Sequence, residues 1–205
     1  MPSSPEVWIR RFHTYAGLYF LFFTWLFCVS GLVLNHPGWR VAGFWAERQQ
    51  ELRRGQVQLT GGAVDSSTAR MVISQLGIRG EISGKVTCTS AEGLRFSIVR
   101  PGDIYDVKVD RRTGVAEVTH TRVNRWGVLN MLHSFTGVRR NDPTRNQNWW
   151  ATGVWRLSMD ALSFGLTFMV LSGLYIWYSR GRHRRGGAVA LLLGTAALAT
   201  CLVGF

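Results

Sequence analysis

Histidines are the residues of this chain best suited to chemistry at a metal. The chain has five histidines among 205 residues. Two of them stand in a shared pattern, in which glycine follows histidine four residues later: "RRFHTYAGL" at residues 10–18 and "NMLHSFTGV" at residues 130–138. A neutral imidazole is a common ligand of haem iron, and a glycine one helical turn away leaves room for a flat ring. One hypothesis is therefore a cofactor groove beside His13 and His133.

The segment that follows His13 has the periodicity of a helix with one narrow face of small or polar residues. At 100° per residue, these residues fall within about 60° of one another. They are His13, Gly17, Thr24, Cys28, Gly31 and Asn35. Two interpretations remain open. Small residues favour close packing of membrane helices, whereas a histidine in such a stripe suits a groove that admits a porphyrin.

Four histidines lie near the ends of long apolar segments. His36 and His133 lie near one end of these segments, and His13 and His183 lie near the other. This arrangement predicts one haem b at each membrane surface, with iron bound by a histidine from each side. The outer pair, His36 and His133, is the stronger prediction because both residues lie at helix ends on the same surface. His183 lies in an arginine-rich loop, so the inner pair is weaker.

Basic residues flank the predicted haem ligands. Arg139 and Arg140 follow His133 and are candidates to pair with haem propionates. The alternative is that His13 and His183, which also lie among arginines, contact lipid phosphates. His36, in "NHP", would then only cap a helix end.

Three stretches without charged residues predict three transmembrane helices. They cover residues 16–34, 161–179 and 186–205, and a span needs roughly 20 apolar residues. A secretory signal is the alternative for the first stretch, but its apolar core is too long and no small-x-small cleavage site follows. Arginines at 10, 11, 180, 182, 184 and 185 place the N-terminus and the 181–186 loop in the cytoplasm. Residues 38–150 then lie outside.

The composition narrows the function classes. Lys and Arg number 24 against 12 Asp and Glu, a net charge of +12. Membrane topology accounts for much of this excess, so a nucleic-acid partner is not expected. The three cysteines, Cys28, Cys88 and Cys201, show no paired spacing, and the absence of C-x-x-C-H excludes covalent c-type haem.

The outer segment predicts a small helix and antiparallel-sheet domain. "STARMVISQLGI" (67–78) has a helical pattern, whereas residues 39–62 are polar and unassigned. Strands are expected over "EISGKVTCTS", "GLRFSIVR", "DIYDVKVD" and "VAEVTHTRV". In the third strand, Tyr105, Val107 and Val109 should share one face and Ile104 the other. "RWGVLNMLHSFTGVRR" (125–140) follows as a short helix suited to the membrane interface.

These segments resemble the PepSY-associated transmembrane family. The resemblance rests on "RRFHTYAGLYFLFFTWLFCVSGLVLNH", on "LHSFTG", on "MDALSFGLTFMVLSGLYIWYSRGR" and on the hairpin in "DIYDVKVDRRTGVAEV", and it covers most of residues 8–182. "VSGLVL" and "LSGLYI" are two matching copies of one motif. Together with the three predicted transmembrane helices, the resemblance implies an α+β membrane protein with a small periplasmic helix and antiparallel-sheet domain of PepSY type.

The resemblance also implies a location and an organisation. The location is the bacterial inner membrane, with the soluble domain in the periplasm. The expected segments are 1–37 (cytoplasmic tail and first helix), 38–124 (PepSY-like domain), 125–148 (interfacial helix and loop), 149–180 (second helix), 181–186 (cytoplasmic loop) and 187–205 (third helix).

Some larger members of the family are inner-membrane, haem-containing reductases that act on ferric siderophores from the periplasmic side. This chain departs from them because it has one PepSY-like domain and only three predicted membrane helices. The positions carried over are His13, His36 and His133, whereas His183 rests on its location alone. The chain has no flavin or NAD-binding motif, so it would take electrons from a quinol or a partner protein. Two functions follow as hypotheses: electron transfer through haem b, with ferric chelates as acceptors, and a non-enzymatic accessory subunit of a larger membrane complex. A regulator of periplasmic proteases is a third.

Overall fold

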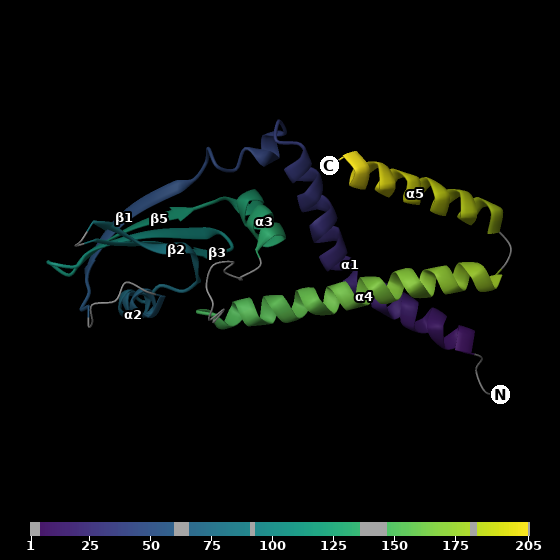
Figure 1. Cartoon of the computed structure of the whole chain (residues 1–205), viewed down its shortest axis with the longest axis horizontal. Coiled ribbons are helices and arrows are strands. Elements are labelled where there is room, and N and C mark those ends of the chain that lie inside the picture. Colours follow the sequence, from purple (N-terminus) through teal and green to yellow (C-terminus); the bar gives the residue numbers. More distant parts are fainter. Residues whose placement is uncertain (1–4, 60–65, 91–92, 136–146, 181–183, 205) are drawn as a thin grey trace. The chain divides into compact units, whose positions relative to one another are not determined.

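The computed structural model describes residues 5–59, 66–90, 93–135, 147–180 and 184–204 (Figure 1). The chain divides into two compact units. The helical unit comprises Met1–Phe23 and Met159–Phe205, and the sheet-containing unit comprises Thr24–Ser158. The helices are α1 (Pro5–Asn35), α2 (Ser66–Leu76), α3 (Arg125–Ser134), α4 (Trp150–Arg180) and α5 (Arg184–Gly204), with a short 3-10 helix η1 (Arg40–Ala42). The strands are β1 (Gln49–Gln56), β2 (Glu81–Ser90), β3 (Gly93–Arg100), β4 (Asp103–Asp110) and β5 (Val115–Arg122).

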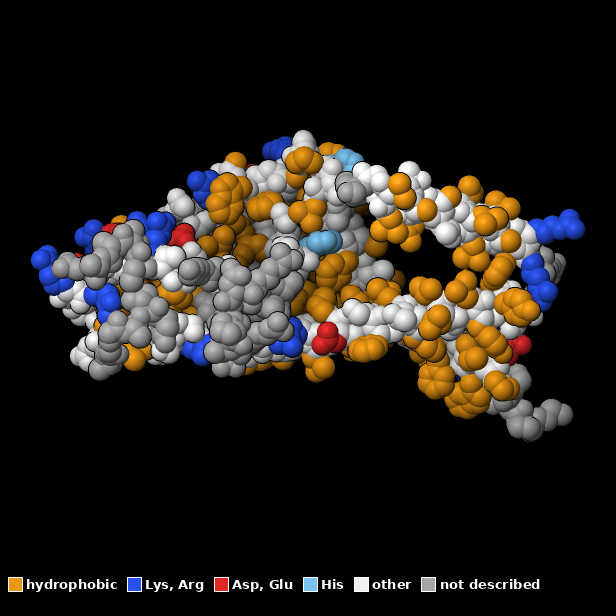
Figure 2. Space-filling view, in the orientation of Figure 1, with side chains coloured by type: hydrophobic (Ala, Val, Ile, Leu, Met, Phe, Trp, Pro, Cys, Tyr) orange, Lys and Arg blue, Asp and Glu red, His pale blue; other side chains and the backbone are white. Residues whose placement is uncertain are grey.

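In the part of the chain that the structure describes, three helices are long and apolar enough to span a membrane, as the sequence predicts. They are α1, α4 and α5. Large hydrophobic side chains are exposed along all three, and Figure 2 shows them over these helices. α5 begins at Arg184 rather than at residue 187, because its two arginines form part of the first helical turn. The fold is therefore α+β with three candidate spans.

The sheet has five antiparallel strands in the order β1-β5-β4-β3-β2. The four predicted strands are confirmed. β1 lies in the polar stretch that the sequence leaves unassigned, and it pairs with β5 from Gln49↔Arg122 to Gln56↔Val115. It is an edge strand whose residues are almost all exposed, so it lacks the alternation that identifies the other strands.

One face of the sheet carries the core of the sheet-containing unit. α2 packs on this face through Ala69 and Val72, both fully buried. Val107 and Val109 are buried on the same face, and Tyr105 packs against the core beside them. The predicted alternation of β4 is therefore confirmed, and so is the prediction of one helix on an antiparallel sheet.

A cluster of charged and aromatic side chains lies at the end of this sheet near the β3–β4 turn. Asp103 Oδ1 accepts a hydrogen bond from His120 Nε2 at 2.6 Å, and Asp103 Oδ2 accepts one from Arg100 Nε at 2.9 Å. The His120 ring stacks on Tyr105 with centroids 4.4 Å apart. Burial by itself would raise the pKa of Asp103, but the His120 hydrogen bond and the Arg100 charge outweigh it and hold the pKa below its ordinary value. The Asp103 carboxylate therefore stabilises the fold.

This carboxylate predicts a pH dependence of stability. A depressed pKa stabilises the folded state above the unfolded value of about 3.9, and the stabilisation is lost as pH falls through the folded pKa. We expect Asp103→Asn to melt below the wild type at pH 5, and the difference in melting temperature to shrink at pH 3. Melting curves of the full chain in detergent measure this. An equal difference at both pH values would contradict the assignment.

The start of α4 is fixed to the sheet by a buried carboxylate. Glu81, only 6% exposed, accepts hydrogen bonds from the backbone N–H groups of Asn148 and Trp149 at 3.0–3.2 Å. The Asn148 side chain also donates to Glu81, and it accepts from Arg70 Nε at 2.7 Å. Asn148 and Trp149 directly precede α4, so Glu81 holds the segment that leads into the helix. The sheet therefore positions the first turns of α4.

Candidate histidine sites

Two histidines form the same contact with a serine of another helix. His133 Nδ1 of α3 lies 2.7 Å from Ser30 Oγ of α1, within the sheet-containing unit. His13 Nδ1 of α1 lies 2.8 Å from Ser172 Oγ of α4, within the helical unit. Both serines are buried and each precedes a glycine. The histidine of each His-x-x-x-Gly pattern therefore meets one copy of the repeated Ser-Gly motif.

The serines determine which imidazole nitrogen carries the proton. Ser30 Oγ donates to Leu26 O at 2.7 Å, and Ser172 Oγ donates to Phe168 O at 2.6 Å. A hydroxyl has one proton to donate, so each serine oxygen accepts from the histidine. Nδ1 of His13 and of His133 is thus assigned as the N–H, and the neutral ring keeps an unprotonated Nε2. This is the tautomer that ligates a metal through Nε2.

His133 lies where α1, α3 and α4 meet in the sheet-containing unit. Its ring lies 5.2 Å from the Phe27 ring, centroid to centroid, and a Cβ placed on Gly31 would lie 3.6 Å from its Cε1. The Trp155 ring of α4 lies 6.5 Å from Phe27, and Trp155 Nε1 donates to Phe135 O at 3.0 Å. The imidazole is half-buried in aromatic and apolar surroundings.

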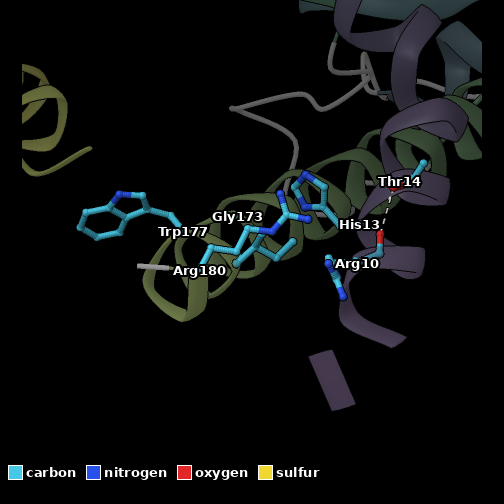
Figure 3. A pocket seen from close by; sticks show the side chains of 7 residues that line it. Arg10, His13, Thr14, Gly173, Trp177 and Arg180 are labelled. Carbon is cyan, nitrogen blue, oxygen red and sulfur yellow. Dashed lines mark hydrogen bonds between the residues drawn. The ribbon is translucent and has the colours of Figure 1, made fainter. Parts of the chain in front are cut away.

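His13 lines a pocket in the helical unit with a volume of about 690 Å³ (Figure 3). Arg10 and His13 contribute from α1, and Gly173, Trp177 and Arg180 from α4. A Cβ placed on Gly173 would lie 3.7 Å from His13 Cε1. Two guanidinium groups and an imidazole thus surround an open space between the two helices.

The glycine of the first His-x-x-x-Gly pattern serves helix packing. A Cβ placed on Gly17 would lie 3.2 Å from Met169 Cε of α4. The space expected there for a flat ring is therefore filled by a side chain. Gly165 of α4 likewise receives the Phe20 ring. Gly31 and Gly173, which follow the two serines, are the glycines that lie beside imidazole carbons.

The stripe expected on the first helix is only partly the contact face of α1. His13, Gly17 and Gly31 lie in contacts as expected, whereas Cys28 and Asn35 are exposed. Sequence reasoning missed the serines as partners of the histidines. The signal that identifies them was present, because "VSGLVL" and "LSGLYI" are copies of one motif.

His36 faces away from His133. Its Nδ1 donates to Leu32 O at 2.8 Å, and its exposed ring stacks on Trp39 with centroids 4.4 Å apart. At 100° per residue, His36 lies roughly 180° around the helix axis from Phe27, which contacts His133. The structure therefore does not bring the predicted outer pair together. In the neutral His36 ring, Nε2 nevertheless carries no proton, because Nδ1 donates its proton to the Leu32 carbonyl.

The other predicted site residues, His183, Arg139 and Arg140, lie outside the described residues. His120, the one histidine that was not predicted to bind haem, belongs to the Asp103 cluster. Within the described ranges, no group of three or more His, Cys, Asp or Glu side chains is arranged to hold a metal ion.

Comparison with known proteins adds no relative. No protein-family model, no curated protein and no solved structure matches this chain.

Proposed function

We propose that the chain is a small b-haem protein of the bacterial inner membrane, of PepSY-associated type, that transfers electrons. The observation that supports this most is His133: an imidazole whose Nδ1–H is held by Ser30, whose Nε2 is unprotonated, and whose surroundings are aromatic. Haem b supplies reversible one-electron chemistry at iron when it is bound. The donor would be a quinol or a partner protein, and periplasmic ferric chelates would be the acceptors.

The residues around His133 fit an axial ligand. Ser30 fixes the tautomer and orientation of the ring, as the second hydrogen bond of a metal-bound histidine commonly does. The Phe27 ring, with its centroid 5.2 Å from that of His133, shields one side of the imidazole from water. His36 is the proposed second ligand, and the 36–39 turn would have to rotate to bring it to the same iron. His133 is therefore the anchoring ligand.

Titration of the purified full chain with haemin tests this proposal. A saturable change in absorbance at one haem per chain is expected for the outer site. A linear, non-saturating response would show only partition into detergent and would contradict it.

An accessory subunit is the second candidate function. The contacts of Gly17 with Met169 and of Gly165 with Phe20 are packing contacts that need no cofactor. The exposed apolar surface of α5 is available to another membrane protein or to lipid. A chain that takes up no haem but co-purifies stoichiometrically with one membrane partner would support this function instead.

The proposed topology places the N-terminus and the loop after α4 in the cytoplasm and the sheet in the periplasm. We expect alkaline phosphatase fused at Gly114 to be active and the same reporter fused after Arg185 to be inactive, since this enzyme needs the oxidising periplasm. A cytoplasmic fluorescent reporter should give the opposite pattern. Phosphatase activity after Arg185 would contradict the topology.

A further inference from the structure

The pocket between the two helix ends of the helical unit has the composition of an anion site. Arg10 lines it from the first turns of α1, and Arg180 lines it from the last turn of α4. His13 adds a polar imidazole, and Ile176 and Trp177 also line the pocket. Among the residues that the structure describes, no carboxylate lines this pocket. Figure 3 shows that its walls come from both helices, so the site depends on their packing.

The charges of this pocket are largely uncompensated. Arg180 has no ion pair or hydrogen bond among the described residues, although it ends a helix whose last carbonyls favour a cation. Arg10 has one ion pair, with Glu6 at 3.7 Å, and both side chains are more than one-third exposed. A pair of that distance and exposure contributes little. The pocket therefore carries a positive charge that is free to meet a ligand.

The position of the pocket along the helices indicates the source of the anion. The uncharged stretch 161–179 of α4 is long enough to cross the hydrocarbon core, and Arg180 follows it directly. Arg180 therefore lies at the depth of the lipid phosphates. In the proposed topology these phosphates belong to the cytoplasmic leaflet, where basic pockets between transmembrane helices bind anionic head groups.

We propose that this pocket binds the phosphate of an anionic phospholipid between Arg10 and Arg180. The acyl chains would run along Ile176 and the exposed apolar flank of α4, as for other lipids held at helix ends. His13 lies at the inner wall of the pocket, where its hydrogen bond to Ser172 keeps α1 and α4 at the separation that the site needs. The proposal does not depend on haem binding at His133. The membrane leaflet that would supply the lipid rests on the proposed topology.

Native mass spectrometry of the full chain in detergent tests the proposal, with added dioleoyl-phosphatidylglycerol compared with dioleoyl-phosphatidylcholine. We expect the wild type to retain phosphatidylglycerol preferentially. Arg180→Gln should weaken that retention about fivefold, since one cation near anionic lipid contributes on the order of this factor. Arg185→Gln removes a neighbouring exposed charge outside the pocket and is the matched control. Arg180→Lys keeps the charge and should retain most of the binding.

Three results would overturn the proposal. The first is equal retention of the two lipids by the wild type. The second is equal loss of phosphatidylglycerol in Arg180→Gln and Arg185→Gln, which would indicate a diffuse surface charge. The third is a loss of haem without a change in lipid retention in Arg180→Gln, which would make the guanidinium a propionate partner. Failure of haem binding at His133 leaves the lipid result unaffected, so the two proposals fail separately.

Discussion

Replacing His133 by alanine is expected to remove nearly all haem from the outer site while the chain remains folded. The variant loses the imidazole whose Nε2 is available to iron, and among the described residues no other histidine contacts Ser30 or Phe27. Its affinity for haemin should fall by more than the roughly 10- to 100-fold that loss of a ligand's hydrogen-bond partner costs. Haemin titration and the reduced absorption spectrum measure this effect.

Substitutions at Ser30 and His36 distinguish a residue that positions the His133 ring from a residue that binds the iron. Ser30→Ala removes the acceptor of the His133 Nδ1–H at 2.7 Å, so haem affinity should fall about 10-fold and the potential should shift. His36→Ala should leave affinity nearly intact but change the spectrum from low to high spin. Ser134→Ala, an exposed neighbour of His133, is the control for Ser30→Ala. Retention of full haem content in His133→Ala would refute the outer site.

Replacing Glu81 by alanine is expected to cause a large loss of stability in the sheet-containing unit. The substitution leaves the N–H groups of Asn148 and Trp149 without their buried acceptor, and an unsatisfied buried donor costs about 1–3 kcal/mol. For the two N–H groups together, the free energy of unfolding should fall by about 3 kcal/mol. This loss corresponds to a fall in melting temperature of roughly 10 °C for a unit of this size. Hydrogen exchange should also quicken at the first turn of α4.

Glu117→Ala is the matched control for Glu81→Ala. Glu117 forms an ion pair with Arg54 at 3.3 Å, but the two side chains are 37% and 72% exposed, so its removal should cost under 1 kcal/mol. Equal effects of the two substitutions would mean that Glu81 does not hold the start of α4. Faster exchange confined to α4 in Glu81→Ala would support the assignment.

The fold was largely predictable because its signals are local. Alternation in "DIYDVKVD" follows directly from one buried and one exposed sheet face, and Val107 and Val109 lie on the buried one. The three long helices follow from uninterrupted apolar sequence. β1 was missed because an edge strand with both faces exposed needs no apolar residues. Its residues instead include charged ones such as Arg53 and Arg54, which protect a free edge.

The sequence predicts which histidines form the candidate site, but it does not predict which side chains they contact. The His-x-x-x-Gly repeat led to His13 and His133, but their serine partners lie 159 and 103 residues away along the chain. Helix periodicity describes one helix at a time and carries no information on which faces meet. For the same reason His36 was paired with His133 by location, although the helical phase directs the two rings to different sides of α1.

The central claim is that this chain binds haem b through His133, and a dithionite-reduced minus oxidised absorption spectrum tests it most directly. The full chain is expressed with haem supplementation, purified in detergent and measured beside His133→Ala. The account predicts sharp α and β bands of a b-type haem in the wild type and their loss in the variant. A colourless wild-type protein, or equal bands in both proteins, would contradict it.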